Sequence, residues 1–377
     1  MSAATPSADG GTFAQANAAE AAAFHTQTRW QVRTSVVYEA FGLLNALSGD
    51  ALAAAQYPAE TAQFAAGMDA DTRAALQRLA AYQQRSGVVL SAVLARNFSA
   101  VNPATLDEAI GLAREPERLR QALRAEAGCR NCPAGGASTA RAWADFSAIL
   151  PDVASALEYL RAAGFEAYWQ EQIRPGLAVS AAEVERFAGG YNIVPVVERS
   201  VGRALPGDTV TVYLVYFQRP YGHRLAGMQL VSTPGLSPAR QVQTAIHELL
   251  HPAYDLADAD IQRGLRRLAE NGFLRQAFDG RDPRYPYNTW SSYLDENAVR
   301  ALEQTISAEL DLPQPWDWAT ADGGMHVLAP VLVDLMAAQG FPASGENFQE
   351  FLLRNINNGT LLSVEQSTAM YEEVVHR

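Results

Sequence analysis

The sequence predicts a helix-rich α+β fold, and three observations lead to this prediction. Apolar residues recur at helical spacing through most of the chain from residue 36 to about residue 205. Two segments between residues 208 and 233 are instead rich in β-branched and aromatic residues, which is typical of strands. After residue 252 the helical patterns return. We therefore expect a small sheet that follows a helical N-terminal part and precedes a helical C-terminal lobe.

The first elements are indicated by composition and by capping residues. Residues 1–24 are rich in Ala, Ser and Gly, so we expect a flexible segment there. Residues 28–33 are expected to form a strand, and Ser35 to cap a helix over 36–47, because serine oxygens accept from the free amides of a first turn. Further helices are expected at 70–84, 88–98, 105–113, 116–127, 141–150, 152–163 and 181–191.

The strands and one helix follow in close succession. Residues 208–218 and 225–233 are expected to be strands joined by a turn. Ser237 and Pro238 then predict a helix start, because serine caps the amides and proline suits the first helical position. The helices expected beyond it are at 259–270, 290–310, 324–339, 347–357 and 363–376.

The helix after Ser237 contains the sequence HELLH over residues 247–251. Because His247 and His251 lie four positions apart, both project from one helical face and can bind one metal ion. Glu248 then stands beside the water that such a metal holds, as a general base of hydrolysis requires. Pro252 predicts that the helix ends at this point, because proline disfavours helical geometry at the residue before it.

Catalytic zinc usually takes three protein ligands, so one further ligand must come from elsewhere. The extended pattern HExxHxxGxxH is absent, which excludes the metzincin arrangement. Two glutamates on downstream helices are candidates, Glu296 and Glu270. We favour Glu296, because it lies in the middle of a predicted helix and a rigid carboxylate suits a fixed ligand set. Asp255 and Asp258 are near in sequence but fit solvated loop residues equally well.

HELLH with a downstream helical glutamate resembles the gluzincin group of zinc metallopeptidases. The combination of HELLHP with ENAVRAL is similar to a bacterial gluzincin-type family, over about residues 207–310. The resemblance implies a zincin-like metallopeptidase fold and zinc-dependent hydrolysis of peptides or proteins. It also implies a substrate that lies antiparallel to an edge strand, for which residues 227–233 are the candidate. Residues 25–255 and 256–377 would then be two parts of one catalytic unit.

In that mechanism Glu248 accepts the proton of the water and passes it to the leaving amine. A further donor is needed for the oxygen that becomes negative. We select Tyr293 as this catalytic residue, because it shares a helix with Glu296; the alternatives are His326, Tyr221 and His223. A carboxylate that orients a histidine ligand is also expected, and either Asp295 or Asp258 could serve.

Composition narrows the partners and the compartment. The net charge of −12 argues against nucleic acid and anionic membranes as partners, since both repel an acidic protein. No apolar run is long enough to span a bilayer. The small residues of the opening MSAATPSADGG favour export to the periplasm or the medium, with a cytoplasmic location as the alternative. Cys129 and Cys132 are predicted to form a short-loop disulfide, which would agree with export; free thiols are the alternative. The oligomeric state is not indicated.

Two other classes of function remain open at this stage. The chain could bind zinc on a zincin fold without peptidase activity, in a binding or structural role. Glu248 argues against this, because a structural site needs no base beside the metal. The chain could also be a helical interaction protein in which HELLH is accidental.

Overall fold

The computed structural model describes residues 24–127, 140–219, 222–282, 287–313, 317–342 and 345–376. Within these ranges the chain has the predicted helix-rich α+β architecture, with one small mixed sheet. None of the described helices combines the length and the apolarity needed to cross a membrane. The predicted disulfide, Tyr221 and nearly all of the predicted flexible N-terminal segment lie outside the described residues.

The sheet has the strand order β1-β2-β4-β3. Strands β1, β2 and β4 are parallel to one another, and β3 pairs antiparallel with the outer side of β4. The bounds are Arg29–Arg33 for β1, Thr209–Leu214 for β2, His223–Arg224 for β3 and Gln229–Ser232 for β4. The prediction that residues 227–233 form an edge strand is therefore wrong, because β3 covers that side of β4.

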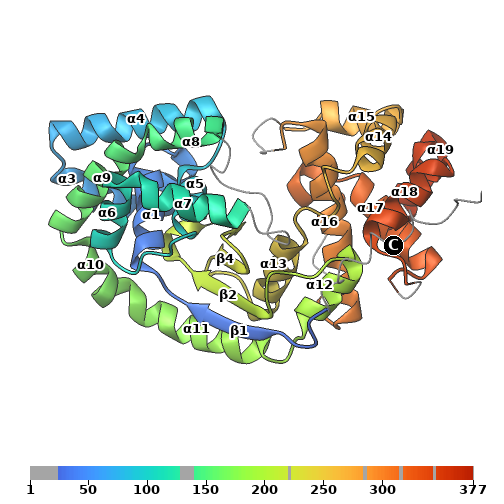
Figure 1. The fold of residues 1–377 in the computed structure, drawn as a ribbon, viewed down its shortest axis with the longest axis horizontal. Coiled ribbons are helices and arrows are strands. Elements are labelled where there is room, and N and C mark those ends of the chain that lie inside the picture. Colours follow the sequence, from blue (N-terminus) through green and yellow to red (C-terminus); the bar gives the residue numbers. More distant parts are fainter. Residues whose placement is uncertain are drawn as a thin grey trace, which may run out of the picture.

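Most of the helices before β2 lie together above and to the left of the sheet, and α11 runs along its lower side beside β1 (Figure 1); these helices and the sheet are called the N-terminal lobe. In chain order they are α1 Val36–Leu47, α2 Ala51–Gln56, α3 Pro58–Ala66, α4 Ala70–Ser86, α5 Leu90–Phe98, α6 Leu106–Arg114, α7 Pro116–Ala127, α8 Ala140–Ser147, α9 Leu150–Ala162, α10 Phe165–Tyr168, a π-helical turn Trp169–Ile173, α11 Arg174–Ala188 and α12 Ile193–Val201. A 3₁₀ turn, Tyr216–Gln218, follows β2.

The helices after β4 form the C-terminal lobe, except for α13, which lies between this lobe and the sheet (Figure 1). Their bounds are α13 Pro238–Leu250, α14 Ala259–Leu268, α15 Gly272–Asp279, α16 Trp290–Glu309, α17 Leu328–Gln339, α18 Phe348–Asn357 and α19 Val364–Val375, with 3₁₀ turns at Ala321–Gly324 and Thr360–Leu362. Helix α13 packs against both β4 and α16.

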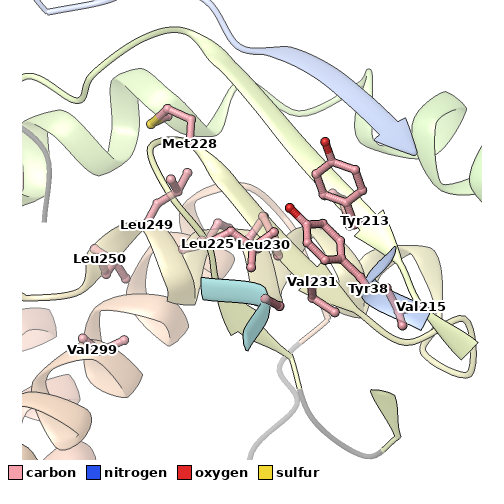
Figure 2. Close-up of a cluster of buried hydrophobic side chains, with 14 of the residues drawn as sticks. Tyr38, Tyr213, Val215, Leu225, Met228, Leu230, Val231, Leu249, Leu250 and Val299 are labelled. Atoms are coloured by element: carbon pink, nitrogen blue, oxygen red, sulfur yellow. The ribbon is translucent and has the colours of Figure 1, made fainter. Parts of the chain in front are cut away.

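Apolar side chains join the sheet to α13. Leu225 and Leu230 lie beside Leu249 on one flank of the helix, and Leu250 lies near Val299 of α16 (Figure 2). All five side chains are buried. Burial of such side chains contributes roughly 1.5–3 kcal/mol each. This packing fixes the rotation of α13 about its axis, and with it the direction in which the two histidines point.

A close approach at Gly42 fixes α1 against the turn after β2. A Cβ atom at Gly42 would lie 2.6 Å from both the Cβ and the carbonyl oxygen of Phe217. We expect Gly42→Ala to lower the free energy of unfolding by about 1–3 kcal/mol, because the overpacking exceeds the gain in helix propensity. Chemical denaturation measures this change. Gly111→Ala is the matched control, because Gly111 lies inside α6 with no atom near the added methyl group; an equal loss in both variants would contradict the explanation.

Candidate metal centre

Helix α13 begins as predicted and presents two opposite faces. The Ser237 hydroxyl accepts a hydrogen bond from the backbone N–H of Arg240 at 3.3 Å, and Pro238 occupies the first helical position. Val242, Ile246 and Leu249 are buried against the core. The His247 and His251 side chains keep 16% and 28% of their surface exposed. The apolar pattern therefore holds the helix while its other face carries the imidazoles.

The helix ends at Leu250, as Pro252 predicts. His251 has an extended backbone, with φ −72° and ψ 131°, so it no longer belongs to the helix. Arg224 of β3 stabilises this end, because its Nη1 donates to the carbonyl oxygens of Glu248 at 2.7 Å and of His251 at 2.8 Å. A positive charge at a helix C-terminus also interacts favourably with the helix dipole. The short strand β3 thus fixes the residue that carries the second imidazole.

Glu296, in the middle of α16, lies opposite the two imidazoles. The Nε2 atoms of His247 and His251 are 3.3 Å apart. One carboxylate oxygen of Glu296 lies 3.8 Å from Nε2 of His247, and the other lies 3.6 Å from Nε2 of His251. These three are the one group of His, Cys, Asp or Glu side chains in the described part of the chain whose atoms converge in a metal-binding geometry.

Two further carboxylates of α16 orient the rings. Nδ1 of His247 lies 3.0 Å from Oε2 of Glu303, and Nδ1 of His251 lies 2.8 Å from Oδ2 of Asp295. An ionised carboxylate accepts a hydrogen bond from the ring nitrogen that it faces, so each Nδ1 carries the hydrogen. The two Nε2 atoms then face each other and Glu296. Asp295 occupies the position that the sequence suggested for an orienting carboxylate.

The surroundings keep the Glu296 carboxylate ionised. Burial favours its neutral form, but the Arg300 guanidinium, 2.6 Å away, and the two histidines hold the pKa of Glu296 well below its usual range. Arg300 also pairs with Asp322 at 2.7 Å, and Asp322 accepts a hydrogen bond from the buried His326 ring at 2.9 Å. An ionised carboxylate is the form that binds a cation.

The negative charge around His251 favours a cation at its ring. Burial lowers its pKa, but the hydrogen bond and the charge of Asp295, with Glu296 and Glu248, outweigh burial and raise the pKa of His251 to about 9. The same charges that favour a proton on this imidazole favour a metal ion beside it.

Glu248 lies between the two histidines in sequence and is half-buried. Across the described ranges, its carboxylate takes part in no hydrogen bond or ion pair, whereas Glu296, Glu303 and Asp295 are all engaged. A carboxylate without a fixed partner, next to the two imidazoles, is available to accept a proton.

The other candidate ligands lie away from this group. Glu270 is exposed, just beyond the end of α14. Asp255 accepts a hydrogen bond from the amide of Ala257 in the loop after α13. Asp258 caps α14 by accepting from the amides of Asp260 and Ile261. The last two are loop and cap residues, and neither orients a histidine.

Tyr293 does not face the imidazoles, contrary to the expectation from its helix. Its ring is fully buried and stacks on Trp290, and its hydroxyl donates to the carbonyl oxygen of Met325 at 2.7 Å. The side chain therefore packs α16 against the rest of the lobe. His223 does not meet this group either, since it lines a separate cavity in the N-terminal lobe.

Tyr287 lies instead beside Glu296, and the sequence analysis missed it. Its hydroxyl makes hydrogen bonds with Glu296 and Arg300. Burial, and then the charge of Glu296, raise the pKa of Tyr287, so the hydroxyl keeps its proton at neutral pH. Its ring also packs edge-on against His326, with centroids 5.8 Å apart. Tyr287 precedes α16 in a segment without a helical or strand pattern, so the sequence held no signal for it.

No family model, curated protein or solved structure matches the chain. The interpretation of this group therefore depends on the chemistry and geometry of its own residues.

Glu303 was also missed, although its spacing held a signal. Glu296, Arg300 and Glu303 follow at intervals of four and three, which places them on one face of α16. We expect Glu303→Ala to weaken binding of a divalent metal ion at this group by about 10- to 100-fold, with Zn²⁺ as the probe, because the carboxylate orients the His247 ring. Competition with a chelating dye measures the affinity.

Glu309→Ala is the matched control for Glu303→Ala. Glu309 belongs to the same helix but pairs with Arg199 near the surface. Equal zinc affinity in the wild type and in Glu303→Ala would show that the contact does not orient the ring.

Proposed function

We propose that this chain is a zinc-dependent peptidase of the zincin type, with His247, His251 and Glu296 as the metal ligands. The observation that carries the proposal is the convergence of two Nε2 lone pairs and an ionised carboxylate, with both Nδ1 atoms engaged by acids. The raised pKa of His251 shows that this position favours a positive charge, which a metal ion between the two Nε2 atoms would supply.

The distances between the ligand atoms also match those around a tetrahedral zinc ion. With Zn–N bonds of about 2.0–2.1 Å, two ligands of a tetrahedral ion lie about 3.3 Å apart. The two Nε2 atoms have this separation. The oxygens of Glu296 are a few tenths of an ångström farther away, at 3.6 and 3.8 Å. Two imidazoles and one carboxylate leave the fourth position open, which is typical of catalytic zinc sites and not of structural ones.

The residues around this position supply the remaining parts of a hydrolytic reaction. When bound, zinc supplies Lewis-acid activation of water and of the scissile carbonyl. Glu248 accepts the proton of the water and delivers it to the leaving nitrogen. The protonated Tyr287 hydroxyl, which lies beside Glu296, is our candidate donor to the oxygen that becomes negative, in the role first considered for Tyr293. Asp295 and Glu303 hold the imidazoles in position.

The order of elements supports the zincin assignment. A small sheet precedes the helix that carries His247, and a later helix contributes the third ligand from the other side. Peptide bonds are the substrates that HELLH with a helical glutamate implies in gluzincins. An exported location remains part of the proposal.

Metal removal tests the function directly. We expect purified protein to contain about one zinc ion per chain and to cleave members of a mixed peptide library. Treatment with a chelator should abolish cleavage, and added zinc should restore it; mass spectrometry of the peptides and metal analysis measure both. Cleavage that survives complete metal removal would contradict the proposal. Bound zinc without any cleavage would instead identify a metal-binding protein without peptidase activity.

A further inference from the structure

A cavity of about 910 Å³ lies in the N-terminal lobe, separate from the three converging metal ligands. It is lined by residues of α4, α5 and α8, by the start of α9 and by β3. In Figure 1 these helices lie together at the upper left, away from α16 and the C-terminal lobe. A volume of this size is within the range of pockets that hold small organic ligands.

The wall of the cavity is mostly apolar. Val89, just before α5, and Val93, inside it, line the cavity, together with Phe146 of α8 and Ile149, just before α9. Phe146 and Ile149 are almost completely buried, so their side chains belong to the core as well as to the wall. An occupant of this part of the cavity must therefore be apolar, because a polar group would lose its hydrogen bonds to water here.

Three largely buried basic side chains, Arg96, Arg224 and His223, line one part of the cavity. Arg96 of α5 is largely buried, with 13% of its side chain exposed, and forms an ion pair with Glu126 at 2.9 Å. Arg224 lies close to Arg96. Burial and, to a smaller extent, the like charge of Arg96 lower the pKa of Arg224 to about 10, although the negative charge of Glu248 opposes this change. Burial and then Arg96 also lower the pKa of His223 to about 4, so this imidazole is neutral at pH 7.

Several nitrogens of this basic group lack an acceptor. Nη1 of Arg96, Nε of Arg224 and Nε2 of His223 have no hydrogen-bond partner among the described residues, although they are shielded from solvent. A buried donor without an acceptor is unfavourable. An anionic oxygen placed here would satisfy these donors and reduce the repulsion between the two arginines.

The charges of the whole lining set agree with an anionic ligand. Four arginines and two aspartates line the cavity, whereas the whole chain has a net charge of −12. Arg78 and Asp152 pair with each other through three hydrogen bonds, two of 3.0 Å and one of 2.7 Å. The lining thus has an excess of positive charge inside an acidic protein, and such a site attracts anions.

We propose that this cavity binds a small amphipathic carboxylate, with the carboxylate at Arg96, Arg224 and His223 and the apolar chain between Val93 and Phe146. This proposal does not rest on the proposed peptidase function, although Arg224 connects the cavity to the helix end that carries His251. A fatty acid and a peptide with an apolar C-terminal residue share this chemistry, and the experiment distinguishes them.

Calorimetry with matched ligand pairs tests the proposal on the full chain. Decanoate is compared with decanol, and N-acetyl-Leu-Phe with its C-terminal amide. We expect at least one acid to bind at least about tenfold more tightly than its neutral partner, because hydrogen bonds to charged groups are strong. Binding of only one acid identifies the source as a lipid or as a peptide terminus. Equal binding of acid and neutral partner, or no binding of any ligand, would overturn the proposal.

Two variants locate the site. Arg96→Gln removes the charge, and Ala92→Trp fills the cavity from α5 without changing any charge. Each should weaken binding of the acid at least about tenfold. Arg29→Gln is the control for loss of one exposed positive charge, since Arg29 lies on β1 with 66% of its side chain exposed. Circular dichroism verifies that each variant is folded. Arg96→Gln also breaks the ion pair with Glu126, so Ala92→Trp is the variant that decides the test. Full affinity in a folded Ala92→Trp protein would show that the acid binds elsewhere.

Discussion

Glu248→Gln is expected to lower the rate of peptide hydrolysis by roughly 10²- to 10⁴-fold, the usual contribution of a general base. The amide has nearly the shape of the carboxylate but cannot accept the proton of water. Among the described residues the Glu248 carboxylate makes no hydrogen bond or ion pair with the His247 or His251 ring, and these rings are oriented by Glu303 and Asp295, so the metal ligands should keep their positions. The measurement is kcat/KM for a peptide that the wild type cleaves, together with zinc content.

The control for this variant is Glu270→Gln, which removes an exposed carboxylate of the same kind. It should keep wild-type turnover. Zinc content that falls together with activity in Glu248→Gln would mean that Glu248 supports the metal and not the proton transfer. Undiminished turnover in Glu248→Gln would rule out its role as base.

Glu296→Gln is expected to weaken zinc binding by more than about 100-fold, which exceeds the effect typical of losing an orienting residue. A neutral amide replaces the one charged ligand and also removes the Glu296 carboxylate from Arg300, which still pairs with Asp322. Peptide hydrolysis should disappear with the metal. Zinc affinity from competition with a chelating dye, and the thermal midpoint of the metal-free protein, separate loss of a ligand from loss of the fold.

Glu270→Gln is the control for Glu296→Gln, because Glu270 was the other candidate for the third ligand. Glu270 is exposed beyond the end of α14, so its amide variant should bind zinc as the wild type does. The opposite result, with zinc lost in Glu270→Gln and kept in Glu296→Gln, would remove Glu296 from the proposed ligand set.

Sequence patterns predicted the elements with strong caps and clear periodicity. Ser35 and Ser237 cap the helices expected of them. The segment 193–201 was missed because its β-branched residues and Pro195 do not favour a helix. It forms α12, buried against α13, where tertiary packing outweighs intrinsic propensity. The strand expected at 225–233 is shortened to Gln229–Ser232, because Gly227 adopts a positive φ of 61° and turns the chain.

Only those residues of the candidate site that are indicated by their position within a helix could be predicted from the sequence. His247, Glu248 and His251 share one turn, and the mid-helix position of Glu296 favoured it over Glu270. Contacts between distant segments left no such signal. Arg224 reaches α13 from β3, and Tyr287 reaches Glu296 from a loop. Tyr293 was selected as a catalytic donor because it shares α16 with Glu296. A separation of three residues along a helix does not show which group the hydroxyl contacts, and here it donates to the carbonyl oxygen of Met325.

Helices α13 and α16 are joined at both ends of one short interface. Asp295 and Glu296 are consecutive residues that meet His251 and the space between the imidazoles, and Glu303, two turns further on, meets His247. A shift of α16 by even one residue would break all of these contacts together. The two helices therefore have a single allowed axial alignment, and they should open to amide hydrogen exchange as one cooperative unit, more slowly with zinc than without it.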